Sequence, residues 1–312
     1  MGMQTLLSVR HSRLVTPVLA LGLIGVACSS TPTAHSDASI LAVGAENEYA
    51  NVISQIGGKY VRVTAIMSNP NTDPHTFEAS PKVAQVVSAA QLVVQNGVGY
   101  DPFMDKIEAA APDSKRKVID VQTLLRLPDN TSNPHLWYGP STMPAVAKAV
   151  ADDLSALAPS HESYFKANLA KFNGSLKTWG QALANLKASF PNAPVATTEP
   201  VADYMLQAAG IDNRTPWPLQ ADIMNGVDPS AQDITQERNL FTEHQVKVFL
   251  YNQQVTDSLT RSFLALAHAN GIPVVGVYET MPTPGYDYQS WMLAEVNALH
   301  KALADGQSTT QL

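Results

Sequence analysis

Two histidines in this chain close the same kind of short turn. One Asp-Pro-His turn ends at His75 and one Asn-Pro-His turn ends at His135, and each comes just ahead of a stretch typical of a helix. Proline restricts the backbone and so fixes the direction of the side chain that follows it. The repeat predicts two imidazoles that point at one target, and the natural target of paired imidazoles is a metal ion.

Two glutamates are the other candidates for this site. Glu199 follows a predicted strand over 194–198, and Glu279 follows a predicted strand over 273–278. In α/β sheets the carboxyl ends of the strands border the ligand crevice, although either glutamate alone also fits a solvated loop. Together with the two histidines they make a set of two imidazoles and two carboxylates, which suits a divalent transition metal.

The first residues have the pattern of a secretory signal peptide, which we place at 1–27. Arg10 and Arg13 precede an apolar run over 14–27 that is too short to anchor the chain across a bilayer. We therefore expect an exported protein.

The single cysteine, Cys28, comes directly after that apolar run. One cysteine excludes an internal disulfide, and its position resembles a bacterial lipobox, in which the cysteine becomes the lipidated first residue. Gly25 departs from the leucine that is usual three places earlier. Residues 28–39 are small and polar and read as the lipidated cysteine with a flexible tether. We expect a lipoprotein on the extracytoplasmic face of the cell membrane.

Composition sets the broad class. The chain has 312 residues, 45% of them hydrophobic, and a formal net charge of -7. Removing 1–27 takes away two arginines and no acids, which leaves 18 basic and 27 acidic residues, or -9. An acidic chain without a basic cluster is a poor candidate for binding nucleic acid and a reasonable one for binding cations.

Short apolar strands alternate with helical stretches in both halves of the chain, which predicts an α/β fold with two lobes. The N-terminal lobe, 40–158, has predicted strands at 40–45, 61–67, 92–95 and 117–121, and helices at 48–56, 81–90, 102–111 and 144–158. The C-terminal lobe, 191–312, has predicted strands at 194–198, 247–251 and 273–278.

Residues 159–190 form a different kind of segment. Their large apolar residues are spaced alternately four and three apart, which predicts one helix about 40 Å long. Gly174 and Gly180 weaken it by about 1 kcal/mol each relative to alanine. The stripe also fits a coiled-coil dimer, but a second α/β pattern begins directly afterwards and needs a connection. We therefore expect a rigid helix that joins two lobes of a monomer.

The order of these motifs resembles the zinc/manganese substrate-binding lipoproteins of bacterial ABC transporters, which are bacterial solute-binding protein family nine. The resemblance covers nearly all of the expected mature chain. It rests on the segments 73–81 (DPHTFEASP), 92–97 (LVVQNG) and 133–137 (NPHLW) and on the connecting helix.

This resemblance implies two α/β lobes around a rigid backbone helix, with a metal ion in the cleft between them. It assigns the ligands to His75, His135, Glu199 and Glu279. It implies a membrane permease and its ATPase as partners. The sequence departs from the family after the second histidine, at 138–140, and lacks the histidine-rich loop of many zinc importers at 131–132.

The ligand set leaves manganese and zinc open as the transported ion. Two bidentate carboxylates and two imidazoles supply the six positions and the oxygen that manganese prefers, whereas zinc takes about four ligands. The set therefore slightly favours manganese, although zinc binds most nitrogen and oxygen sites more tightly. Protons should compete with the metal as the pH falls towards about 6.5.

Three alternatives remain. A metallohydrolase needs an open metal position, and the sequence has no His-Glu-x-x-His motif or serine nucleophile elbow, so we expect no enzyme. A protein that binds a siderophore or another organic ligand shares the two-lobed architecture but needs no metal quartet. A metal-dependent surface adhesin is compatible with transport.

Overall fold

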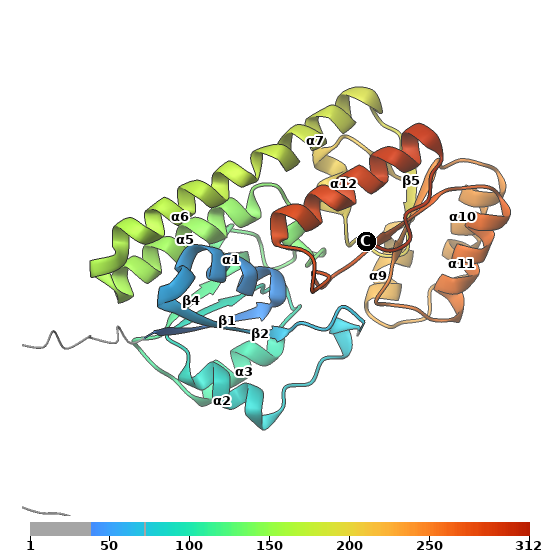
Figure 1. Ribbon diagram of the computed structural model, residues 1–312. Coiled ribbons are helices and arrows are strands. Elements are labelled where there is room, and N and C mark those ends of the chain that lie inside the picture. The colour runs from blue at the N-terminus through green and yellow to red at the C-terminus, as the bar shows by residue number, and fades with distance from the viewer. Residues whose placement is uncertain (1–38, 72) are drawn as a thin grey trace, which may run out of the picture. The chain divides into compact units, whose positions relative to one another are not determined.

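Each half of the chain is built on a parallel sheet of four strands (Figure 1). The computed structural model describes residues 39–71 and 73–312. The predicted signal peptide, Cys28 and all but the last residue of the tether lie outside the described residues.

The N-terminal sheet has the order β2-β1-β3-β4. Helices α1 and α5 pack on one face and α2 packs on the other with α3. The strands are β1 (Ile40–Glu46), β2 (Val61–Met67), β3 (Leu92–Gln95) and β4 (Lys117–Asp120). The helices are α1 (Asn47–Gly57), η1 (Gly58–Tyr60), η2 (Pro74–Thr76), α2 (Pro81–Ala89), α3 (Pro102–Ala110), α4 (Val121–Leu124), η3 (Leu136–Tyr138) and α5 (Thr142–Leu157).

The C-terminal sheet repeats this topology in the order β6-β5-β7-β8. Its strands are β5 (Pro194–Thr197), β6 (Asp212–Asn213), β7 (Val248–Asn252) and β8 (Val274–Val277). Its helices are α8 (Asp203–Ala208), α9 (Trp217–Met224), α10 (Ala231–Thr242), α11 (Ser258–Ala269) and α12 (Tyr288–Asp305). In both sheets the chain order reverses beside the first strand, which is where doubly wound sheets place their ligands.

Two helices in line, after the short η4 (Pro159–His161), connect the lobes. They are α6 (Glu162–Ser175) and α7 (Lys177–Ser189), so the expected single helix is interrupted at Leu176. Leu176 keeps helix-like dihedral angles (φ -70°, ψ -15°), and α7 continues the direction of α6 in Figure 1. The Ser175 hydroxyl, just before the interruption, donates to the Phe172 carbonyl oxygen, an acceptor that the helix itself needs.

The apolar stripe on these helices packs into the core of the same chain. Phe165, Phe172 and Trp179 are buried in one cluster that also contains side chains from α1, α5 and α12. Two smaller clusters lie on the opposite faces of the two sheets. The largest cluster therefore runs through both lobes and the helices that connect them.

Polar contacts also fasten the lobes together. The Asn47 amide, at the start of α1, donates to the carbonyl oxygen of Met281 (2.8 Å) and accepts from its N–H (3.0 Å). The Tyr138 hydroxyl donates to the Tyr278 carbonyl oxygen at 2.8 Å. These bonds attach the segment around Glu279 to the N-terminal lobe.

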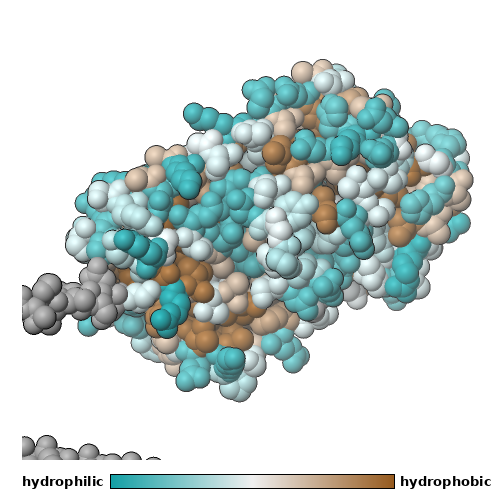
Figure 2. Space-filling view, viewed as in Figure 1, coloured by the Kyte–Doolittle hydropathy of each residue, from teal (hydrophilic) through white to brown (hydrophobic). Residues whose placement is uncertain are grey.

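Hydrophilic and mixed residues cover most of the face shown in Figure 2, with a hydrophobic area near β1 and β2. Among the described residues, four large hydrophobic side chains are exposed: Leu41, Val118, Trp217 and Val227. None of the described helices combines the length and apolar character that crossing a membrane requires.

The predicted strands agree closely with the observed ones. The strands predicted at 61–67 and 92–95 have the bounds of β2 and β3, and the other predicted strands differ by one residue at one or both ends. The sequence analysis missed β6, a two-residue strand at the sheet edge. The α/β class with two lobes is confirmed.

Glu295 makes stability depend on pH. Burial raises its pKa to about 8, against a partial opposing effect of its polar contacts with Tyr138 and Trp291. A folded state that holds this proton more tightly than the unfolded chain loses stability as the pH rises from about 4.5 to about 8. The loss reaches roughly 5 kcal/mol, because the pKa rises from 4.5 to about 8 and each pKa unit is worth about 1.4 kcal/mol.

Glu295→Gln should remove this loss, because glutamine stays neutral and still accepts from Trp291. We expect the melting temperature of the metal-free variant, relative to wild type, to be several degrees higher at pH 8.5 than at pH 5. Glu243→Gln, at an exposed position, is the control. A difference between variant and wild type that stays constant with pH would contradict the prediction.

Candidate metal centre

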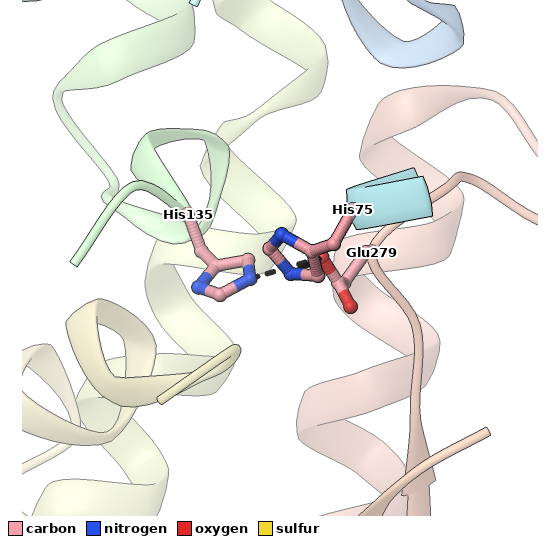
Figure 3. Close-up of side chains that lie close together, drawn as sticks. All are labelled: His75, His135 and Glu279. Atoms are coloured by element: carbon pink, nitrogen blue, oxygen red, sulfur yellow. Dashed lines mark hydrogen bonds and ion pairs between the residues drawn. The ribbon is translucent and has the colours of Figure 1, made fainter. Parts of the chain in front are cut away.

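Three side chains converge on one point between the lobes (Figure 3). The Nε2 atoms of His75 and His135 each lie 3.1 Å from Oε2 of Glu279. One nitrogen or oxygen atom from each of the three residues lies within 4.8 Å of the others. In a tetrahedral site with bonds of about 2.0 Å, ligand atoms are ~3.3 Å apart, so the spacing fits a shared ion.

The turn that carries His135 is held from both lobes. The Asn96 amide, just after β3, donates to the Pro134 carbonyl oxygen at 2.8 Å. The Asn133 amide donates to the Pro200 carbonyl oxygen at 2.8 Å, and the Tyr204 hydroxyl donates to the Asn133 carbonyl oxygen at 2.8 Å. Four fixed hydrogen-bonding groups therefore set the direction of a fully buried imidazole.

Asn133 also determines which nitrogen of His135 carries the proton. Because its amide nitrogen donates to Pro200, its Oδ1 atom is the acceptor that faces the ring, 2.8 Å from Nδ1 of His135. The same Oδ1 accepts from the His135 backbone N–H at 3.0 Å. Nδ1 must donate, so the neutral ring presents its Nε2 lone pair to Glu279.

Two lone pairs therefore face each other across a buried gap. The Nε2 atom of neutral His135 and the carboxylate oxygen of Glu279 are both acceptors, and both side chains are fully buried. Such a contact at 3.1 Å is unfavourable unless a cation lies between the acceptors. A metal ion bound by both atoms would remove this repulsion.

His75 lies on the solvent side of the centre. Its turn is the 3₁₀ helix η2, in which the Asp73 carboxylate accepts from the His75 backbone N–H at 2.8 Å. Its side chain is 22% exposed, whereas those of His135 and Glu279 are fully buried. A cavity of about 530 Å³ lies beside it, lined from both lobes by residues such as Asp73 and Asp257. An ion from solvent therefore meets His75 first.

Glu279 follows β8 and is anchored at its backbone and at its side chain. The Tyr100 hydroxyl donates to Oε2 at 3.0 Å. The Gln254 amide oxygen accepts from the backbone N–H groups of Glu279 (2.7 Å) and Thr280 (2.8 Å). The carboxylate is thereby held in place beside both imidazoles.

Glu199 lies next to this group but slightly apart from it. Its Oε2 atom is 4.0 Å from Nε2 of His75 and has no hydrogen-bond partner among the described residues. Its Oε1 atom accepts from the Asn252 amide at 3.2 Å. The structure thus brings all four predicted residues together, three of them closely and Glu199 at the edge.

The two carboxylates differ in their proton affinity. Burial acts to raise the pKa of Glu279, but the charge and the hydrogen bond of His75 outweigh this effect, so the net pKa of Glu279 is depressed. Burial and the charge of Glu279 raise the pKa of Glu199 well above its ordinary value. Glu279 is therefore the carboxylate that loses its proton more readily and Glu199 the one that holds a proton more tightly, and a bound cation would compete with that proton.

The histidines differ as well. Burial acts to lower the pKa of His75, but the charge and hydrogen bond of Glu279 and the charge of Asp73 raise it overall. Burial lowers the pKa of His135 against the opposing effect of Glu279. His135 is therefore the neutral imidazole and His75 the one that takes up a proton.

The sequence analysis missed three residues that hold the carboxylates: Tyr100, Asn252 and Gln254. Asn252 is the last residue of β7, so the strand-end reasoning that found both glutamates also applied to it. Tyr100 and Gln254 carry no comparable local signal.

Comparisons with known proteins find similarity over most of the chain. The family model described as zinc-uptake complex component A, periplasmic, matches residues 43–302. The chain is 20% identical over 244 residues to the manganese-binding lipoprotein MntA of Bacillus subtilis (strain 168), covering 76% of this chain and 78% of that protein. It is 24% identical over 218 residues to the manganese ABC transporter substrate-binding lipoprotein PsaA of Streptococcus pneumoniae serotype 4, covering 64% and 69%.

A solved structure shares the fold. The periplasmic zinc binding protein TroA from Treponema pallidum superposes with a TM-score of 0.72 at 17% identity. The superposition covers 87% of this chain and all of that one. The likeness shows a common two-lobed architecture.

Asn133→Ala should weaken metal binding without removing a candidate ligand, because His135 loses the acceptor that fixes its tautomer. We expect the Kd for zinc to rise about 10- to 100-fold, measured by competition with a chelator of known affinity. Asn185→Ala, on the exposed surface of α7, is the control. Unchanged affinity in Asn133→Ala would contradict the assigned tautomer.

Proposed function

Because the chain belongs to the family described as zinc-uptake complex component A, periplasmic, we propose that it is the extracytoplasmic substrate-binding component of a metal-ion ABC importer. It captures a divalent transition metal, manganese or zinc, and delivers it to a membrane permease driven by an ATPase. Relatives named for manganese and a structural neighbour named for zinc leave both ions open for this chain.

The observation that carries the proposal is the buried contact between His135 and Glu279. Two acceptor atoms 3.1 Å apart need a cation, and His75 and Glu199 supply further donor atoms around the same point. With neutral histidines, the two carboxylates balance the charge of a dication, which makes its burial tolerable. We assign the ligands to these four residues.

Delivery requires the captured ion to be released. The donors come from both lobes, so relative movement of the lobes would separate them. We take residues 40–158 and 191–312 as the lobes of a monomer and 159–190 as the connection that limits this movement.

We propose that Cys28 carries the lipid that holds the protein at the outer surface of the membrane.

A catalytic role has less support. Four protein groups fill the coordination shell of a zinc ion, so no position remains for the water that a metallohydrolase activates. Two alternatives are the capture of a siderophore and adhesion to a surface, and neither is explained by the metal centre alone. Membership of the family favours metal import over both alternatives.

The four assigned ligands can be tested by metal analysis. Wild-type protein should bind one equivalent of zinc or manganese. His75→Ala, His135→Ala, Glu199→Ala and Glu279→Ala should each lose more affinity than the about 10- to 100-fold that is lost when a group that hydrogen-bonds to a ligand is removed. His268→Ala, on α11, is the control. If all four variants bind the metal as well as wild type, the ion lies elsewhere and the assignment is wrong.

A further inference from the structure

Asn252 contacts both candidate carboxylates at once. Its amide nitrogen lies 2.7 Å from Oε1 of Glu279 and 3.2 Å from Oε1 of Glu199. The residue is fully buried at the end of β7, between β5, which leads to Glu199, and β8, which leads to Glu279. One amide group can therefore give one hydrogen to each carboxylate.

The orientation of this amide is determined by its surroundings. The Oδ1 atom of Asn252 accepts from the backbone N–H of Gln254 at 3.0 Å, so this end of the amide must be the oxygen. The backbone N–H of Asn252 donates to the Thr198 hydroxyl at 3.0 Å, which fixes the backbone as well. Among residues 39–71 and 73–312, the acceptors of the two amide hydrogens are carboxylate oxygens.

The two oxygen atoms of each carboxylate therefore face different partners. The Oε1 atoms of Glu199 and Glu279 face the amide, and their Oε2 atoms face the imidazoles. The donor atoms that remain for an ion are two Nε2 atoms and two Oε2 atoms. Four donors match the tetrahedral preference of zinc, whereas manganese prefers about six positions and more oxygen.

We propose that Asn252 determines metal specificity by restricting each glutamate to one metal-facing oxygen, so that the centre favours a four-coordinate ion of the zinc type over manganese. This inference rests on the proposed metal-binding function. It reverses the slight preference for manganese that two bidentate carboxylates imply, because the amide competes for their second oxygens.

Asn252→Ala tests the inference, since it releases both Oε1 atoms. Asn252→Ser is the second variant: its shorter hydroxyl has a single hydrogen and can donate to at most one carboxylate. Asn213→Ala is the matched control, because the Asn213 amide donates to Asp203 and Thr197 in the same lobe and to neither of the assigned glutamates. Circular dichroism identifies the variants that fold.

The measurements are the Kd values for Zn²⁺ alone and for Mn²⁺ alone, from chelator competition, and the coordination number of bound zinc from X-ray absorption. We expect the ratio of the manganese Kd to the zinc Kd to fall about 10-fold or more in Asn252→Ala and by less in Asn252→Ser. The ratio should not change in Asn213→Ala. Wild-type zinc should be four-coordinate, with a higher number in Asn252→Ala.

Two results would overturn the inference and leave the proposed function standing. One is an unchanged Kd ratio in folded Asn252 variants that still bind one equivalent, and the other is an equal loss of affinity for both ions, which would make Asn252 a positioning residue only. If Asn252→Ala does not fold, the ratio in Asn252→Ser decides. If wild-type protein binds neither ion, the proposed function fails, and this inference fails with it.

Discussion

The meeting of two buried acceptors, His135 Nε2 and Glu279 Oε2, is the constraint on which the rest of the structure depends. Left alone, they repel at 3.1 Å, and burial removes the water that could separate them. The surrounding groups hold them together: Asn133 fixes the ring, and Tyr100 and Gln254 hold the carboxylate. A centre built this way is complete only with a cation in it, which suits a protein that captures metal ions.

Hydrogen bonds near the centre join the two lobes that supply the candidate ligands. Glu279 comes from the C-terminal lobe, but Asn47 and Tyr138 bond its neighbours to the N-terminal lobe. Asn252 bonds Glu279 to Glu199 within the C-terminal lobe, and Asn133 bonds Pro200, beside Glu199, to the N-terminal lobe. Both glutamate segments are therefore fastened to both lobes. Relative movement of the lobes must break the hydrogen bonds of Asn47, Tyr138 and Asn133.

Most of the architecture follows from local patterns. Buried parallel strands such as β2 and β3 are short apolar runs bounded by turns, and they are visible in the sequence. The apolar stripe of the connecting helices was equally visible. The interruption at Leu176 was not visible, and beside it the Ser175 hydroxyl bonds to Phe172 and accepts from Gln289 of α12. Such a tertiary contact leaves no periodic signal.

The sequence by itself determined the chemistry of the centre: Pro-His turns direct two imidazoles, and strand ends place two carboxylates at the edge of a parallel sheet. Only the tertiary structure decided how these groups are used. It selects the His135 tautomer through Asn133, and it aims one oxygen of each glutamate through Asn252. These choices depend on hydrogen bonds of 2.7 to 3.2 Å, and those that join Asn133 to Pro200 and Asn252 to the glutamates connect residues far apart along the chain. Residue type and spacing do not encode such distances, because packing sets them only when both lobes are folded together.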